Sequence, residues 1–185
     1  MAIRIKSHWH NEDAQRPLDD IASAIAFIAW RIAKDKAINL HGERFIYEDD
    51  RQRMAVIAEY LYFQIQILDR MVYTRLEDAD RRTLIVRLAL KLAEHVQDNS
   101  QDLLGPADYG RPFINGLNQR GSEYAELNFT DDGPSYPFLR HLGYQIQRLM
   151  GEREENRWVI DQVMERDGGE IYKQISRAIN DLTSL

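Results

Sequence analysis

Hydrophobic residues recur along the chain mainly at intervals of three and four positions, which is the period of an α-helix. Between Leu18 and Ile32 they form one stripe, but Phe27 and Trp30 fall outside it, so this helix has two apolar surfaces. The whole pattern predicts six helices, over residues 17–37, 49–73, 80–97, 137–150, 154–167 and 170–183.

The predicted helix over residues 49–73 is apolar around most of its circumference. At 100° per residue, its hydrophobic side chains cover roughly 220°. The remaining narrow polar strip consists of Gln52, Glu59, Gln66, Asp69 and Arg70. A helix with so little polar surface is typical of the centre of a bundle. We therefore expect an all-α, single-domain bundle of about six helices that spans residues 1–185.

The connection between the third and fourth predicted helices is unusually long. Residues 98–137 contain five of the ten glycines and four of the five prolines. They also contain five aromatic residues and most of the excess acidic charge, which is unlike a solvated tail. We expect 98–136 to form an ordered excursion over the bundle, with a short helix at Pro112–Arg120 and a weak strand at Tyr124–Phe129. A long ordered connection is where function is most often located.

Charge and composition exclude several classes of protein. The net charge of −6 argues against nucleic acid as the main partner, although arginines between residues 70 and 91 leave a basic face as the alternative. The absence of cysteine excludes disulfides and thiolate chemistry and fits a reducing compartment. The longest uncharged stretch, Ile21–Trp30, has ten residues, about half the length of a membrane span. Without an export signal, we expect a cytoplasmic protein.

His8 and His10 form the most suggestive short motif. On an extended chain, side chains two residues apart point the same way, so both imidazoles could bind one metal ion. The alternative is a pair of surface histidines near the N-terminus. None of the five histidines has an acidic residue three positions before it, which argues against a di-iron bundle. Because glycine-rich phosphate and dinucleotide motifs are also missing, we expect no cofactor.

Two polar residues lie on apolar helix faces. Gln64 falls within the hydrophobic arc of residues 49–73, where a buried amide needs hydrogen-bond partners. We favour a structural hydrogen bond to a loop backbone, and the alternative is a group that orients a ligand. His95 falls at the edge of the stripe in residues 80–97, which is more typical of a core-edge histidine than of a catalytic base.

Our first functional hypothesis is a non-enzymatic interaction protein that self-associates, most simply as a homodimer. Its basis is a surplus of apolar surface, because four aromatic residues need cover: Phe27, Trp30, Phe45 and Tyr47. Two-fold homodimers are the commonest oligomers, and aromatic residues are enriched in interfaces. A further protein partner would fit the same hypothesis.

The alternative hypothesis is an enzyme or a protein that binds a small molecule or metal, with its site between the bundle and residues 98–137. The candidate residues are Arg111, Asn115, Arg120, Glu123 and Tyr124, with Gln64 or His95 beneath them. Arg111 and Arg120 would bind an anionic group. Glu123 could act as a base if burial raised its pKa.

Overall fold

Helix α2 (Asp50–Val72) lies at the centre of the molecule, as predicted, and packs against α1, α3, α4, α5 and α7. The structure is a computed structural model that describes residues 12–183. Helix α2 begins where the Asp49 carboxylate accepts a hydrogen bond from the Gln52 backbone N–H at 2.7 Å. More than half of its side chains are buried in one continuous hydrophobic core. This arrangement confirms the prediction of an all-α bundle.

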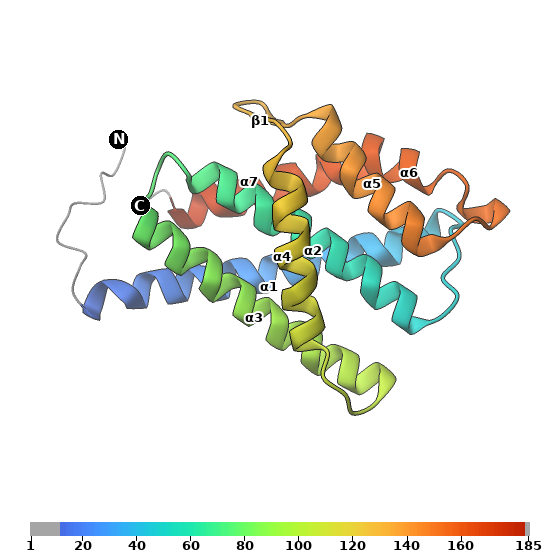
Figure 1. The fold of residues 1–185 in the computed structure, drawn as a ribbon, viewed down its shortest axis with the longest axis horizontal. Coiled ribbons are helices and arrows are strands. Elements are labelled where there is room, and N and C mark those ends of the chain that lie inside the picture. The colour runs from blue at the N-terminus through green and yellow to red at the C-terminus, as the bar shows by residue number, and fades with distance from the viewer. Residues whose placement is uncertain (1–11, 184–185) are drawn as a thin grey trace.

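The described residues contain six helices of at least 15 residues, arranged around that core (Figure 1). These are α1 (Glu12–Gly42), α2, α3 (Asp78–Leu104), α4 (Gly110–Ala125), α5 (Tyr136–Met150) and α7 (Gly168–Thr183). Helices α1 and α3 pack extensively on each other, and α7 lies against α1 and α2. Helix α4 lies across α2 and α3 at a steep angle, so one end of it reaches α3 and the other α5.

The segment 98–136 lies over the bundle as predicted, but more of it is helical than expected. Helix α3 continues to Leu104, and α4 occupies Gly110–Ala125, well beyond the short helix expected at Pro112–Arg120. The glycines inside α4 suggested an irregular segment. One of them, Gly116, is needed because a Cβ there would overlap the Tyr62 hydroxyl of α2. The expected strand is reduced to β1 (Phe129–Thr130), paired antiparallel with β2 (Gly133–Pro134).

The predicted helix over 154–167 is also wrong. This region forms a 3₁₀ turn (Glu154–Asn156), the short helix α6 (Val159–Gln162) and a π-helical turn (Val163–Asp167). The buried Asn156 amide hydrogen-bonds the backbone of Ile46 and Met150, which fixes the first turn. Gly168 and Gly169 do not end the helical path but begin α7, which continues directly from the π-helical turn.

The first helix starts earlier than the sequence pattern suggested. It begins at Glu12 rather than Pro17 and ends at Gly42 rather than near residue 37. The residues before Pro17 include Glu, Ala, Gln and Arg, which are good helix formers, and they extend the helix past the proline. Among residues 12–183, no helix is both long enough and apolar enough to span a membrane.

Candidate functional site

Helix α4 brings three of the predicted site residues together against α2 and α5. Arg120, Glu123 and Tyr124 lie in its last two turns, and Arg120 and Glu123 contact Glu59 and His141 from the neighbouring helices. Arg111 and Asn115 lie toward the other end of α4 and are exposed. Arg111 forms only an exposed ion pair with Asp108, at 3.4 Å. The predicted cluster is therefore split into a buried half and an exposed half.

Arg120 is the centre of a buried polar network that also contains Glu59, Glu123, His141 and Gln145. Its Nε and Nη2 donate to the Glu59 carboxylate at 2.7–3.1 Å, and Nη2 also donates to Gln145 Oε1 at 2.9 Å. Its Nη1 donates to both Glu123 oxygens, at 3.1 and 3.3 Å. All three guanidinium nitrogens therefore already donate to acceptors within the chain, two of them ionised carboxyl groups. The expectation that Arg120 binds an external anion is wrong, because its charge is already paired with Glu59 and Glu123.

Glu123 joins Arg120 to His141. Its Oε2 lies 2.9 Å from His141 Nε2, and its Oε1 accepts a hydrogen bond from Gln119 at 3.0 Å. Partial burial of Glu123 favours its neutral form. The Gln119 hydrogen bond and the charges of Arg120 and His141 outweigh that effect and lower the pKa of this carboxyl group. Glu123 is thus a weaker base than an ordinary glutamate, which contradicts its predicted role.

His141 and Glu59 titrate in the direction that burial dictates. Burial lowers the pKa of His141, and the Glu123 carboxylate offsets only part of this effect. Burial also raises the pKa of Glu59, which is only 4% exposed, although hydrogen bonds and charge from Arg120 oppose it. Burial thus favours the neutral imidazole, and although His141 Nε2 lies 2.9 Å from Glu123 Oε2, it makes no well-aligned hydrogen bond with a described residue.

Tyr124 belongs to the core rather than to an open site. Its ring is fully buried between Phe138, at a centroid distance of 4.5 Å, and His141, at 4.7 Å. Its hydroxyl has no hydrogen-bond partner among the described residues. Burial raises the pKa of this phenol well above its usual value, so the group stays neutral.

Gln64 and His95 lie away from the Arg120 network. The Gln64 amide donates to the backbone oxygens of Ala29 and Tyr60, at 3.1 and 3.2 Å, which fits the structural interpretation with a helix in place of the expected loop. His95 stacks on Trp30 with ring centroids 5.8 Å apart. Neither residue therefore underlies a site at the segment 98–137.

A second buried polar group, the Lys36 cluster, connects α1, α2 and α7 and was not predicted. It consists of Lys36, Tyr60, Asp167 and Glu170. Lys36 pairs with Glu170 and lies 3.9 Å from Asp167. The fully buried Tyr60 hydroxyl donates to Asp167 at 2.7 Å. Burial raises the pKa of Asp167, and Tyr60 and Lys36 counteract part of that rise.

The four predicted interface residues differ in what covers them. Phe45 is 7% exposed, and the Tyr47 hydroxyl donates to the Ala37 backbone oxygen at 2.7 Å, so both are covered by their own chain. Trp30 is partly buried against His95. These three do not need a partner, which corrects the prediction. Phe27 differs from them, because it is 61% exposed.

The metal-binding hypothesis falls on residues that the structure does not describe. His8 and His10 lie outside residues 12–183. Within that range, no group of three or more histidine, aspartate or glutamate side chains is placed to hold a metal ion.

Sequence reasoning missed Glu59, His141 and Gln145 as partners of Arg120. Glu59 was assigned to the polar strip of its helix, where it should face solvent. Arg120 is 61 residues from Glu59 and 25 from Gln145, so no helical spacing rule connects them. The sequence around Arg120 gave no signal of burial, because its neighbours Asn118, Gln119, Ser122 and Glu123 are polar.

Comparison with known proteins does not assign the chain to a family. No protein-family model matches it, and neither a curated protein nor a solved structure matches it at a significant level.

Proposed function

We propose that the protein is a non-enzymatic cytoplasmic interaction protein that self-associates as a homodimer through the outer face of α1. One observation carries this proposal. Phe27 lies at the midpoint of a 31-residue helix and is 61% exposed, while the opposite side of the same helix is buried in the core. An exposed phenylalanine at the centre of a long helix is a typical interface anchor.

Phe27 belongs to a stripe that we call the α1 seam, formed by Asp20, Ala24, Phe27 and Arg31. Their spacing of four, three and four residues places them on one side of the helix, as in the contact line of a two-stranded coiled coil. Asp20 and Arg31 are exposed and form no ion pair with any described residue. The seam therefore has a small residue and an aromatic residue at its centre and opposite unpaired charges at its ends.

This order of residues is self-complementary. If two copies of α1 pack antiparallel about a two-fold axis between Ile25 and Ala26, Phe27 of each copy meets Ala24 of the other. The same axis places Asp20 opposite Arg31 of the second copy. A two-fold interface makes each contact twice, so the dimer gains two aromatic contacts and two rim ion pairs. The seam is only about 16 Å long, so we expect dissociation in roughly the micromolar range.

Charge exchange along the seam tests this proposal by sedimentation velocity. We expect D20R and R31D each to weaken the dimer at least tenfold, because each variant places like charges opposite one another. The double variant D20R/R31D should restore association. The matched control D98R, which changes an exposed acid on α3 in the same way, should leave it unchanged. Equal dimerisation of all four variants would contradict the proposal.

A second candidate function is the binding of a small apolar molecule between the bundle and α4. A pocket of about 260 Å³ lies there, lined by Ala55, Ala58, Tyr62, Val96, Ser100 and Phe113 among others. Ser100 is 2% exposed, and its hydroxyl bonds to no other described residue. Such a pocket fits an apolar ligand with a single hydrogen-bonding group.

Ligand-observed NMR with a library of small apolar fragments tests this second function. Fragments that bind the protein should lose affinity in S100V, which removes the hydroxyl, and in A58F, which fills the pocket. The exposed V86F should bind them normally. If no fragment binds, or if binding survives A58F, the pocket has no such role.

A further inference from the structure

The outer face of α5 carries an alternation of tyrosine and arginine. Tyr136, Arg140, Tyr144 and Arg148 recur at every fourth position and so lie along one side of the helix, which we call the α5 face. Tyr136 is 68% exposed and Tyr144 is 49% exposed. The opposite side of α5 is buried against α2 and α6, so the tyrosines are not displaced core residues.

The α5 face is basic in a protein that is acidic overall. Helix α5 contains no aspartate or glutamate, whereas the chain has a net charge of −6. Neither Arg140 nor Arg148 forms an ion pair with a described residue, although Arg148 lies 5.8 Å over the Tyr144 ring. Exposed arginines elsewhere among the described residues are divided, because Arg87, Arg111, Arg153 and Arg166 have an acidic partner whereas others, such as Arg51 and Arg82, have none.

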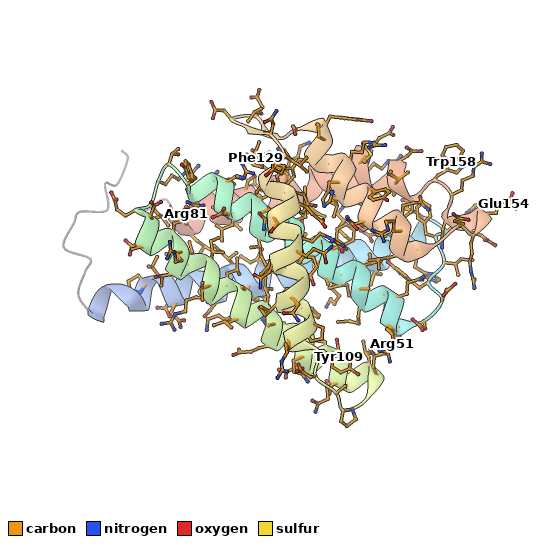
Figure 2. All side chains as sticks on the ribbon, in the orientation of Figure 1. Arg51, Arg81, Tyr109, Phe129, Glu154 and Trp158 are labelled. Atoms are coloured by element: carbon orange, nitrogen blue, oxygen red, sulfur yellow. The ribbon has the colours of Figure 1, made fainter. Side chains whose placement is uncertain are left out.

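A shallow depression opens beside these arginines. It has a volume of about 520 Å³ and is lined by Leu127, Tyr136, Pro137, Arg140, His141 and Tyr144. The 61% exposed Trp158 projects from the surface on the α5 and α6 side (Figure 2). Tyrosine, tryptophan and arginine are the residues that contribute most to binding energy at protein interfaces. A hollow with the unpaired Arg140 in its wall is suited to an apolar side chain next to a carboxylate, and Arg148 lies two turns further along α5 for a second carboxylate.

We propose that the α5 face docks an acidic amphipathic segment of another protein. Two carboxylates of that segment would pair with Arg140 and Arg148, and an apolar side chain next to the carboxylate at Arg140 would enter the depression. The arginines are eight residues apart, about 12 Å along the helix. That distance corresponds to two turns of a partner helix, or to about four residues of an extended partner strand.

The charges around the face favour an acidic protein segment over a nucleic acid. Asp131 and Asp132 precede α5, and Glu152 follows it, so acidic residues lie in sequence on both sides of the two arginines. A polyanion that extends past both ends of the helix would meet these carboxylates and be repelled. A short segment with two carboxylates places its charge only where the arginines are.

This inference does not depend on the α1 seam. Helix α5 packs mainly on α2 and α6, and α1 packs on α3, α2 and α7. The α5 face and the α1 seam therefore lie on two different helices. A variant that cannot dimerise, D20R, should bind the acidic segment as the unmodified protein does. Failure of the homodimer and failure of this proposal can therefore be told apart.

Selection from an unbiased peptide library tests the partner's chemistry directly. We would pan a phage-displayed library of random peptides of about 16 residues against the full chain. Selected peptides should be enriched in aspartate and glutamate over the input library and should contain an aromatic or leucine residue next to one of the acids. No selected peptides, or peptides without acid enrichment, would overturn the proposal.

Binding of a selected peptide is then measured by fluorescence anisotropy. R140Q/R148Q should weaken it at least tenfold, as should raising the salt concentration from about 50 to about 300 mM. The control R51Q/R82Q removes two exposed unpaired arginines elsewhere and should have no effect. Equal binding by R140Q/R148Q contradicts the proposal. A change in the protein's own sedimentation in R140Q/R148Q also contradicts it, because a second copy would then be the occupant. Tighter binding of an oligonucleotide than of the peptide at this face contradicts it as well.

Discussion

Arg120 and Glu59 form a bidentate ion pair in which Nη2 lies 2.7 Å from Oε1 and Nε lies 2.9 Å from Oε2. Glu59 is 4% exposed, so its charge is compensated almost entirely by Arg120 and not by water. The pair fastens α4 to α2, and the bonds from Arg120 to Gln145 and Glu123 bring in α5. The network thus holds the crossing helix in position across the bundle.

Removing Arg120 should destabilise the fold strongly. R120M leaves the Glu59 charge buried without a partner, and we expect it to lower the free energy of unfolding by about 3–5 kcal/mol. The double variant E59L/R120M removes both charges, and its free energy of unfolding should decrease much less. Urea unfolding followed by circular dichroism measures both. R111M, at an exposed arginine of the same helix, is the matched control. Its free energy of unfolding should stay within about 0.5 kcal/mol of that of the unmodified protein. A double variant as unstable as R120M would contradict this account.

His141 should titrate below its ordinary value of 6.5, because burial disfavours the imidazolium. In E123Q the pKa should fall further, since the Glu123 carboxylate favours the charged ring. NMR titration of the ring proton signals measures both values. The unfolded chain takes up this proton at higher pH than the folded one, so stability should decrease as the pH falls from 6.5 toward the folded pKa. A higher pKa in E123Q would be inconsistent with these interactions.

The bond from Tyr60 to Asp167 should stabilise the Lys36 cluster. Y60F removes the buried hydroxyl that donates to the ionised Asp167 carboxylate. We expect it to lower the free energy of unfolding by about 1–3 kcal/mol near neutral pH. The pKa of Asp167, already raised by burial, should rise further because Tyr60 lowers it. The folded state then holds this proton to higher pH than the unfolded chain, so the deficit of Y60F should shrink as the medium becomes acidic. Y73F, at a 60% exposed tyrosine, is the control. A deficit independent of pH would exclude this role.

Two glycines of α4 should respond oppositely to alanine. A Cβ at Gly116 would overlap the Tyr62 hydroxyl and lie 3.0 Å from Cζ, so G116A should destabilise the protein by about 1–3 kcal/mol. At Gly121 the nearest atom is Gln66 Nε2, at 3.6 Å, which is an ordinary contact. G121A should therefore be neutral or should stabilise the helix by up to about 1 kcal/mol. Thermal unfolding compares the two variants. Equal effects would show that Tyr62 does not prevent a Cβ at residue 116.

The sequence was sufficient for the parts of the fold that depend on local periodicity. The apolar circumference of α2 predicted its central position, because only a surrounded helix can bury that much surface. Glycine and proline content misled the prediction for α4. Gly116 is there for close packing on Tyr62, and that contact joins residues 54 positions apart. No local pattern distinguishes such a glycine from one that ends a helix.

The Arg120 network could be predicted only in part for the same reason. The sequence pointed to Arg120, Glu123 and Tyr124 because they carry charged or hydrogen-bonding side chains within an unusually long connection. Glu59 and His141 come from other helices, and their contact with α4 depends on how α4 crosses the bundle. Phe45 and Tyr47 show the converse limit. The sequence showed that these aromatic side chains must be buried, but it did not show that the same chain buries them.

The central claim is that two copies associate through the α1 seam, and light scattering coupled to size-exclusion chromatography tests it most directly. At about 50 µM protein, the unmodified chain should elute with nearly twice its mass of 21.7 kDa, and the mass should fall on dilution. F27E should elute as a monomer, whereas V86E, at a 50% exposed valine on α3, should remain a dimer. A monomeric unmodified chain at that concentration, or a dimer that survives F27E, would contradict the account.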